Sequence, residues 1–365
     1  MSGNDSYWTK DSDLMWSDQF PMYYALIIVP TCVVGLFGNA LSITIYCGPS
    51  FRQRSINILL AAMAFCQFLM LFCSLPNFWP DNQLPSWLFV TAILYLYPLT
   101  LIFHCSAIWL LIAITCERWV AVCRPLLVST YFTRRKALMA VFLATFLAFA
   151  FCAPRFWDAG VVWSHDTEEF SFIKLLQNDE NYVFWYKTVA TTFAVYVLPL
   201  ALIAFGNALI VRQIRKSKII RRQMTMNLDK QDAKEHTSEM LLYIVLFFII
   251  CYSLCLILNL LDAFHPEFLE TTHVGAMLVP INNGLVALNA SLDFVMYLRF
   301  STRYRRAAIQ LLTSGTCLKP DNTFLHRFRL DNFMLVMSGG AQEKTRQTDE
   351  TTISYEFDCK RDIFL

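Results

Sequence analysis

Charge is missing from seven long stretches of this 365-residue sequence, each of at least eighteen residues without Lys, Arg, Asp or Glu. The stretches are 22–47, 55–80, 82–116, 137–154, 188–211, 240–261 and 271–292. A helix needs about 20 mostly apolar residues to cross a bilayer core, and a charge at mid-depth costs roughly 2.5–3.5 kcal/mol. Charged residues make up 16% of the chain, so composition alone does not explain their absence. The sequence predicts an all-α membrane protein, a bundle of seven transmembrane helices, and excludes a soluble helical core.

Basic residues are scarce on one side of the predicted membrane. Four basic and fourteen acidic residues occur in 1–21, 81, 155–187 and 262–270. Nineteen basic and five acidic residues occur in 48–54, 117–136, 212–239 and 299–306. Because short cytoplasmic loops carry an excess of Lys and Arg, we expect a plasma-membrane protein with its N-terminus outside and its C-terminus in the cytoplasm. The acidic outer side either attracts cationic ligands or only reflects topology.

This topology divides the chain into four parts. They are an extracellular N-terminus at 1–21, a seven-transmembrane domain at 22–298, a short C-terminal amphipathic juxtamembrane helix at 299–317 and a cytoplasmic tail at 318–365. No cleavable signal peptide is evident, because the first twenty residues are polar and acidic. The first span is therefore expected to act as its own insertion signal.

Cysteine is missing from the outer segments. None of the twelve Cys residues lies in 1–21 or 155–187, and most lie inside the predicted spans. Loop residues therefore offer no outer disulfide, and the buried Cys side chains are expected to act as small hydrophobes. Cys317 differs, because it follows a basic amphipathic segment and suits a palmitoylated thiol at the bilayer surface. On the outer side, Asn4 begins an Asn-Asp-Ser sequon, which is either a glycosylation site or a chance match.

A motif stands at the inner end of the third span. Glu117-Arg118-Trp119 is followed by Pro125-Leu126, and this arrangement resembles the signature of rhodopsin-like G-protein-coupled receptors. A charged pair at a helix end also suits simple snorkelling at the interface, but here it coincides with the Pro-Leu pair and with seven spans. The resemblance covers all seven spans and the amphipathic segment. Further matches to the family are Gly38-Asn39, Pro199 and the region from Asn289 to Tyr297.

The resemblance implies a two-state switch at this end. Glu117 is expected to hold Arg118 at rest, and Arg118 to meet a G protein when the sixth helix moves outward, with Leu126 as an apolar contact. The family's second restraint, an acid at the start of the sixth helix, aligns with Lys234, next to Glu235. The expected coupling and switch residues are Glu117, Arg118, Trp119, Pro125, Leu126, Asn207, Tyr252, Asp293 and Tyr297.

The usual carboxylate of the second span is missing from the core. Gln67 aligns with the family's sodium-binding Asp, while Asp293 is the only Asp or Glu within the spans away from their ends. An ionisable group inside a membrane is a functional hypothesis by default. Two interpretations stay open: a neutral Asp293 hydrogen-bonded to Asn39, Gln67 or Asn289, or an ion or proton switch that could hold sodium at Asp293.

Other residues typical of the family are also replaced. In the sixth span Tyr252 stands for a Trp and Leu254 for a Pro, so the usual cause of a helix kink is absent. In the fifth span Asn207 stands for a Tyr. The bridging Cys of the third span aligns with Ile93, and its loop partner is missing as well, which predicts a more mobile outer loop.

Several ligand classes are excluded by absent residues. Thr100 aligns with the Asp that pairs small amines, and Ala287 with the Lys that holds retinal. The stretch 153–158, Ala-Pro-Arg-Phe-Trp-Asp, resembles the Asn-x-Pro-Arg-Phe-Phe-Glu stretch of invertebrate FMRFamide-type neuropeptide receptors. That resemblance implies a peptide pocket lined by Asn77, Phe78, Tyr97, Thr100, His104, Asn259, Asp262 and Asn283. Asp158 and Glu267 are further candidate acids, although a solvated loop is the simpler explanation of each.

We therefore expect a G-protein-coupled receptor for an extracellular neuropeptide, of the FMRFamide-like (RFamide) type, and not an enzyme. Its expected partners are an amidated peptide, a heterotrimeric G protein, membrane lipid and an arrestin at the Thr and Ser residues of 348–356. We expect no nucleic acid and no cofactor. The alternatives are a chemosensory seven-transmembrane receptor for a small molecule and a membrane transporter, although no internal repeat of the transporter kind is evident.

Overall fold

Long helices account for most of the described chain. Their sequences are apolar on all sides, which suits helices that are surrounded by lipid and by one another. The computed structural model describes residues 20–78, 86–124, 127–164, 169–176, 179–224, 232–264 and 272–314. Residues 1–311 form one compact unit, and 312–365 form a second unit of which only 312–314 are described. Within the described residues, six helices are long and apolar enough to cross a membrane, and a seventh apolar segment lies at Val245–Leu261.

The first four spans and their connections follow the chain in order. They are α1 (Phe20–Cys47), α2 (Ser55–Ser74) with the 3-10 turn η1 (Leu75–Phe78), α3 (Ser86–Thr91) with the π-helix η3 (Ala92–Leu96) and α4 (Tyr97–Cys123), the short α5 (Val128–Tyr131), and α6 (Arg134–Cys152) with the 3-10 turn η5 (Ala153–Trp157). A β-hairpin of β1 (Ala159–Ser164) and β2 (Glu169–Lys174) follows.

The remaining spans include unusual winding. The fifth consists of the π-helices η7 (Tyr182–Ala190) and η8 (Thr192–Val197) and then α7 (Leu198–Met224). The sixth is α8 (Asp232–Phe264), the seventh is α10 (His273–Phe300), and α11 (Thr302–Ser314) comes next. The predicted all-α seven-helix bundle is confirmed. Several helices extend past their charge-free runs, because Lys and Arg are good helix formers beyond the bilayer core.

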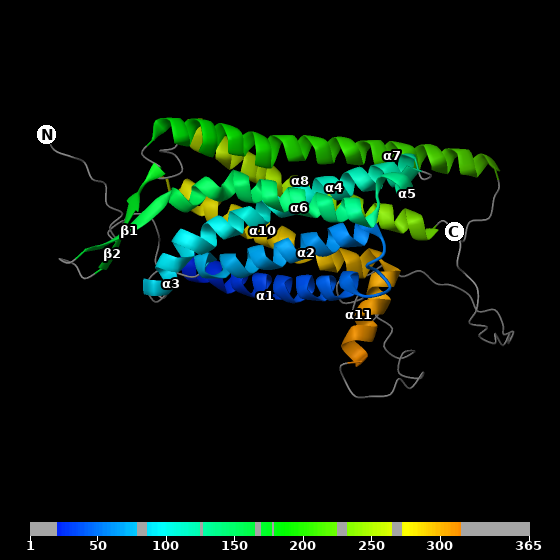
Figure 1. Ribbon diagram of the computed structural model, residues 1–365, viewed down its shortest axis with the longest axis horizontal. Coiled ribbons are helices and arrows are strands. Elements are labelled where there is room, and N and C mark those ends of the chain that lie inside the picture. The colour runs from blue at the N-terminus through cyan, green and yellow to red at the C-terminus, as the bar shows by residue number, and fades with distance from the viewer. Residues whose placement is uncertain are drawn as a thin grey trace. The chain divides into compact units, whose positions relative to one another are not determined.

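The spans run side by side along the length of the bundle (Figure 1). α2 contacts α1, α4 and α6. α4 also contacts α6 and α7. The bundle is completed by α8, which contacts α7 and α10, and by α10, which contacts α1. In the most apolar part of each span, 56% of the residues of α2 with η1 are buried, against 22% of those of α6 with η5. The apolar side chains that α6 leaves exposed, such as Phe142 and Phe146, are suited to contact lipid tails.

Two glycines bring the first and seventh spans close together. A Cβ atom on Gly38 would lie 2.0 Å from the Phe294 ring, and one on Gly35 would lie 2.1 Å from the Ser291 hydroxyl. Small residues at such positions allow membrane helices to approach each other closely. The Gly38-Asn39 match therefore has a packing cause, which places Asn39 against α10.

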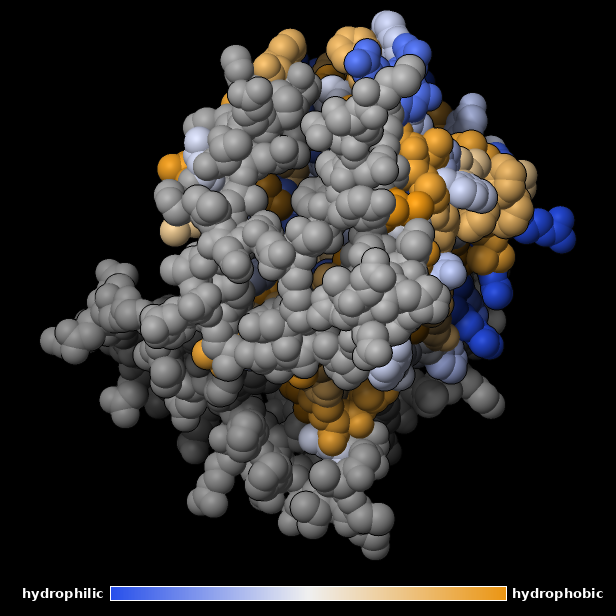
Figure 2. Space-filling model, turned by 90° about the vertical axis from the view of Figure 1, so that its left-hand side faces the viewer, coloured by the Kyte–Doolittle hydropathy of each residue, from blue (hydrophilic) through white to orange (hydrophobic). Residues whose placement is uncertain are grey.

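Figure 2 views the molecule from the side that lies at the left of Figure 1. Apolar side chains form most of the coloured surface there, with hydrophilic residues around its margin. The hairpin projects at this end, and α11 lies near the opposite end of the bundle (Figure 1).

Candidate functional site

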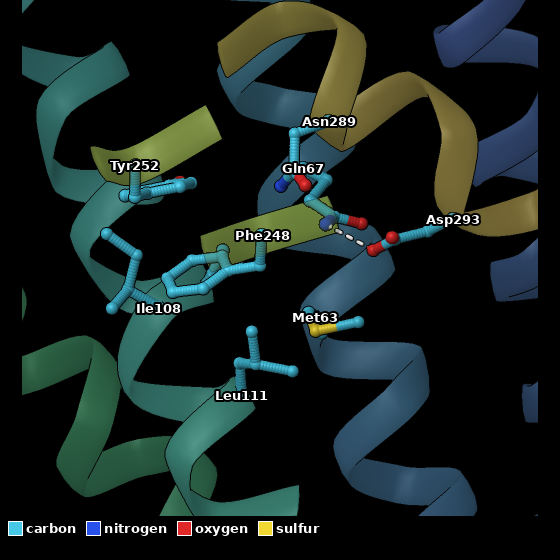
Figure 3. Close-up of a pocket in the computed structure, with 9 residues that line it drawn as sticks. Met63, Gln67, Ile108, Leu111, Phe248, Tyr252, Asn289 and Asp293 are labelled. Carbon is cyan, nitrogen blue, oxygen red and sulfur yellow. Dashed lines mark hydrogen bonds between the residues drawn. The ribbon is translucent and has the colours of Figure 1, made fainter. Parts of the chain in front are cut away.

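A small cavity with a mostly apolar lining lies inside the bundle, between α2, α4, α8 and α10 (Figure 3). Its volume is about 20 Å³, and Gln67, Asn289 and Asp293 supply its polar lining. Gln67 Nε2 donates a 2.7 Å hydrogen bond to Asp293 Oδ2, and both side chains are 5% exposed. Gln67 Oε1 and Asn289 Oδ1 are buried without a hydrogen-bond partner. The structure thus brings together three of the four predicted core polar residues.

The fourth, Asn39, has its own partners. Its amide nitrogen donates to the carbonyl oxygens of Gly35 at 2.9 Å and of Ala290 at 3.0 Å. Asn39 therefore joins α1 to the backbone of α10 and has no hydrogen bond with Asp293. Its role in this structure is to hold the helix that carries Asp293.

Oxygen ligands of the kind that hard cations prefer surround the cavity. They are the Asp293 carboxylate and the unpartnered amide oxygens of Gln67 and Asn289. No cluster of three or more His, Cys, Asp or Glu side chains occurs among the described residues, so this site is unsuited to a transition metal. The three oxygens fit the chemistry of a small monovalent cation.

Tyr252 of α8 also lines the cavity. Its ring stacks on Phe248 at 3.9 Å between centroids and on His104 at 5.4 Å with an angle of 6°. The Nδ1 atom of His104 lies 3.4 Å from the sulfur of Met70. His104 is 9% exposed, so the structure places this predicted pocket residue in the packed core beneath the outer half of the bundle.

The Glu-Arg pair at the inner end is arranged differently from the expectation. Ser55 Oγ donates to Glu117 Oε1 at 2.6 Å, and Glu117 is 4% exposed. No ion pair joins Glu117 to Arg118, whose Nε is buried without a partner. Adjacent residues on a helix do not face each other, so Glu117 points to α2 and Arg118 does not share that direction. Ser55 of α2 is thus the hydrogen-bond partner of Glu117, and the restraint of Arg118 by Glu117 stays a prediction.

The other switch residues have mixed surroundings. Trp119 is 39% exposed, and Asn207 is buried and donates to the carbonyl of Ile203 in its own helix at 2.7 Å. Tyr297 is 1% exposed, and its hydroxyl has no partner. Pro125 and Leu126 lie outside the described residues, as do the side chains of Lys234 and Glu235.

An aromatic cluster that the sequence analysis missed surrounds Tyr297. Its ring lies 5.5 Å from Tyr46 of α1 and 5.4 Å from Tyr304 of α11. The hydroxyls of Tyr304 and Ser42 are hydrogen-bonded at 2.8 Å. Burial raises the pKa of Tyr304 to about 12, although the bond to Ser42 opposes that rise.

The predicted pocket residues lie toward the outer end. Asn77 and Thr100 donate to carbonyls of their own helices, those of Cys73 and Leu96. The remaining outer residues differ in exposure: Tyr97 is 46% exposed, Phe78 packs against Tyr24 at 6.1 Å, Asn259 is half-buried and Asn283 is exposed. Asp262 lies in α8, but its side chain is outside the described residues, as are Asn4, Glu267, Cys317 and the tail.

Asp158 is not available as an acid for a ligand. It is 6% exposed, and its carboxylate accepts hydrogen bonds from Arg155 and from the hydroxyl of Tyr182. The expectation that it contacts a peptide is therefore corrected, because a ligand would have to displace both donors.

Known proteins with similar sequences are receptors. The family model described as "7 transmembrane receptor (rhodopsin family)" matches residues 38–293. The FMRFamide peptide receptor frpr-18 of Caenorhabditis elegans is 30% identical over 317 residues, which cover 83% of this chain and 71% of that receptor. The FMRFamide receptor of Drosophila melanogaster is 25% identical over 288 residues, 75% of this chain and 51% of that receptor. Growth hormone secretagogue receptor type 1 of Homo sapiens is 25% identical over 326 residues, 85% of this chain and 86% of that receptor.

Proposed function

Because this chain belongs to the rhodopsin family of seven-transmembrane receptors, we propose that it is a cell-surface receptor for an amidated peptide of the FMRFamide class. The observation that carries this proposal is the 30% identity to an FMRFamide peptide receptor over 83% of the chain. The resemblance drawn from the Glu117-Arg118-Trp119 motif is confirmed by the family match. Membership in this family also removes the transporter alternative, and its members are receptors rather than enzymes.

The ligand chemistry follows from the outer half of the bundle. An RFamide peptide ends in Arg-Phe-amide, which presents a guanidinium, an aromatic ring and a neutral carboxamide, so it needs an anionic or aromatic surface and hydrogen-bonding partners. Tyr97 offers an exposed ring on which a guanidinium can stack. Asn259 is half-buried and lies three residues before Asp262 in the chain. We assign the acid contact to Asp262 or Glu267, because Asp158 is already paired.

Signal transfer is assigned to the inner end. Arg118 would meet a heterotrimeric G protein there, with the C-terminus in the cytoplasm and the N-terminus outside as the charge asymmetry predicts. Its buried Nε lacks a partner, so a carbonyl or carboxylate of a G protein would satisfy it. Basic residues on α11 would contact anionic lipid, and the tail would bind an arrestin after phosphorylation.

The central cavity would couple the two ends. Gln67, Asn289 and Asp293 are the residues that would hold a sodium ion, which would supply positive charge beside the buried carboxylate. Tyr252 joins this region to His104 and therefore to the floor of the outer half. Motion of α8 would change the position of Tyr252 against the cavity and its stacking on His104 together.

Expression of the full-length receptor in a cell line with a calcium or cAMP readout tests the proposal. Amidated RFamide peptides should activate it, and the same peptides with a free C-terminal carboxylate serve as the matched control and should be much weaker. Activation by a small volatile molecule, and by no amidated peptide, would instead support the chemosensory alternative. In the same cells Arg118→Ala should abolish the agonist response while peptide binding persists, and an unchanged response would remove Arg118 from the switch.

A further inference from the structure

The outer hairpin has no covalent anchor to the bundle. No Cys occurs in residues 155–187, and β1 pairs with β2 from Ala159 opposite Lys174 to Ser164 opposite Glu169. An isolated two-stranded hairpin is only marginally stable in water. β1 contacts η3, the π-helical turn of the third span that contains Ile93. An ordered hairpin at this position therefore requires other attachments to the helices.

Asp158 stands where the hairpin meets the fourth span. Its carbonyl accepts a 3.1 Å hydrogen bond from the backbone nitrogen of Leu175, which closes the base of the hairpin. Its carboxylate accepts from Arg155 Nη1 at 3.3 Å and from the hydroxyl of Tyr182. The Arg155 and Asp158 side chains are only 10% and 9% exposed. A buried ion pair of this kind is held firmly only when further hydrogen bonds satisfy its remaining atoms.

The fifth span supplies those additional contacts. Arg155 Nη2 donates to Thr191 Oγ1 at 3.4 Å, and the guanidinium lies 5.5 Å from the centre of the Tyr186 ring. The Tyr186 hydroxyl donates to the carbonyl of Phe151 at 2.6 Å. Tyr182 and Tyr186 pack against each other at 5.0 Å between ring centroids. The fourth and fifth spans and the hairpin base therefore meet around one ion pair.

The π-helical winding of the fifth span is what makes this meeting possible. Tyr182 and Thr191 are nine residues apart, which is two and a half turns of an α-helix, so α-helical winding would put them on opposite faces. A π-helix has about 4.4 residues per turn, so nine residues make about two turns and return to the same face. The segments η7 and η8 run from Tyr182 to Val197, and Thr191 donates to the carbonyl of Tyr186, five residues earlier. The unusual winding thus presents all three fifth-span partners to Arg155 and Asp158.

We propose that Arg155, Asp158, Tyr182, Tyr186 and Thr191, named here the outer brace, replace a disulfide as the anchor of the β1–β2 hairpin. The outer brace ties the hairpin base to the fourth and fifth spans, whereas a disulfide would tie the hairpin to the third. The outer brace predicts less motion of the hairpin than the missing bridge alone would predict. This inference goes beyond the proposed function and does not depend on which ligand the receptor takes.

Hydrogen–deuterium exchange of the purified full-length receptor, without ligand, tests the outer brace. Tyr182→Phe removes one hydroxyl and should speed exchange of the backbone amides of 159–164 and 169–176 by about tenfold or more, the factor expected for loss of a hydrogen bond to a charged group. Thr191→Val removes a longer, weaker contact, and the expected increase is about threefold. Exchange within α2 and the inner half of α4 should stay unchanged in both variants.

Matched substitutions at neighbouring positions serve as controls. Tyr95→Phe makes the same chemical change on an exposed side chain of η3, and Thr192→Val makes it at a hydroxyl that has no hydrogen-bond partner. Both should leave hairpin exchange at the wild-type rate. Arg155→Met should give the largest increase, and if that variant fails to fold, Tyr182→Phe still decides the question. Wild-type hairpin exchange in folded Tyr182→Phe protein would overturn the proposal, whatever ligand activates the receptor.

Discussion

Replacing Gln67 tests how the buried carboxylate of Asp293 is stabilised. Gln67→Leu removes the 2.7 Å hydrogen bond to Asp293 Oδ2 while keeping a side chain of similar size against Met63 and Phe248. A hydrogen bond to a charged group contributes about 1.5–3 kcal/mol, and Asp293 is 5% exposed, so water cannot easily replace the donor. We expect the substitution to lower the free energy of unfolding by about 2–3 kcal/mol.

A second substitution separates the hydrogen bond from the charge. Asp293→Asn removes the charge but keeps an oxygen that can accept from Gln67, so alone it should cost less than about 1 kcal/mol. In the Gln67→Leu background the same change removes a charge that has lost its donor. The two effects should therefore be coupled by about 1–2 kcal/mol rather than additive.

Unfolding of the detergent-solubilised receptor with a thiol-reactive dye measures these effects, because buried thiols such as Cys66, Cys105 and Cys251 become reactive only on unfolding. A stability rise when sodium replaces choline, present in the wild type and absent in Asp293→Asn, would indicate a bound cation. Additive effects of the two substitutions, or a Gln67→Leu protein as stable as the wild type, would refute the reasoning that Gln67 supports an ionised Asp293.

Other contacts lead to shorter tests. Gly38→Ala would place a methyl group 2.0 Å from the Phe294 ring, so thermal unfolding should show a loss of about 1–3 kcal/mol, and unchanged stability would mean that α1 and α10 can separate freely. Ser55→Ala leaves the buried Glu117 without its 2.6 Å donor and should cost about 1–3 kcal/mol, whereas Ser55→Thr should retain most of it. Tyr304→Phe should cost about 1 kcal/mol through loss of the Ser42 contact. Folding raises the Tyr304 pKa from 10.0 to about 12, so the contribution of the neutral phenol to the free energy of unfolding is complete below pH 10 and is lost as the pH rises toward 12. Between these pH values the wild type should therefore lose stability faster than Tyr304→Phe.

The sequence was sufficient for the architecture because charge is so costly inside a bilayer that its absence marks the spans. It also located the polar core, since Gln67, Asn289 and Asp293 do line one cavity. Partner choice was less predictable. Glu117 hydrogen-bonds to Ser55, sixty-two residues away, and neither residue's spacing or type specifies that contact.

The outer end was the least predictable part. Asp158 looks in sequence like any acid of an outer loop, and only the winding of the fifth span shows that two tyrosines and a threonine enclose it with Arg155. Residues 182–197 are richer in β-branched residues than the neighbouring helices α6 and α7, but that composition does not specify a π-helix.

The π-helical part of the fifth span also affects how this receptor compares with its relatives. Sixteen residues, from Tyr182 to Val197, make about four and a half turns in an α-helix and about three and a half as a π-helix. Residues before Pro199 in the chain therefore fall progressively out of step with those of a receptor that is α-helical at the same place, by up to about three-quarters of a turn at Tyr182. An alignment without gaps would then equate side chains on different faces, so selectivity rules transferred by position would fail first on this span.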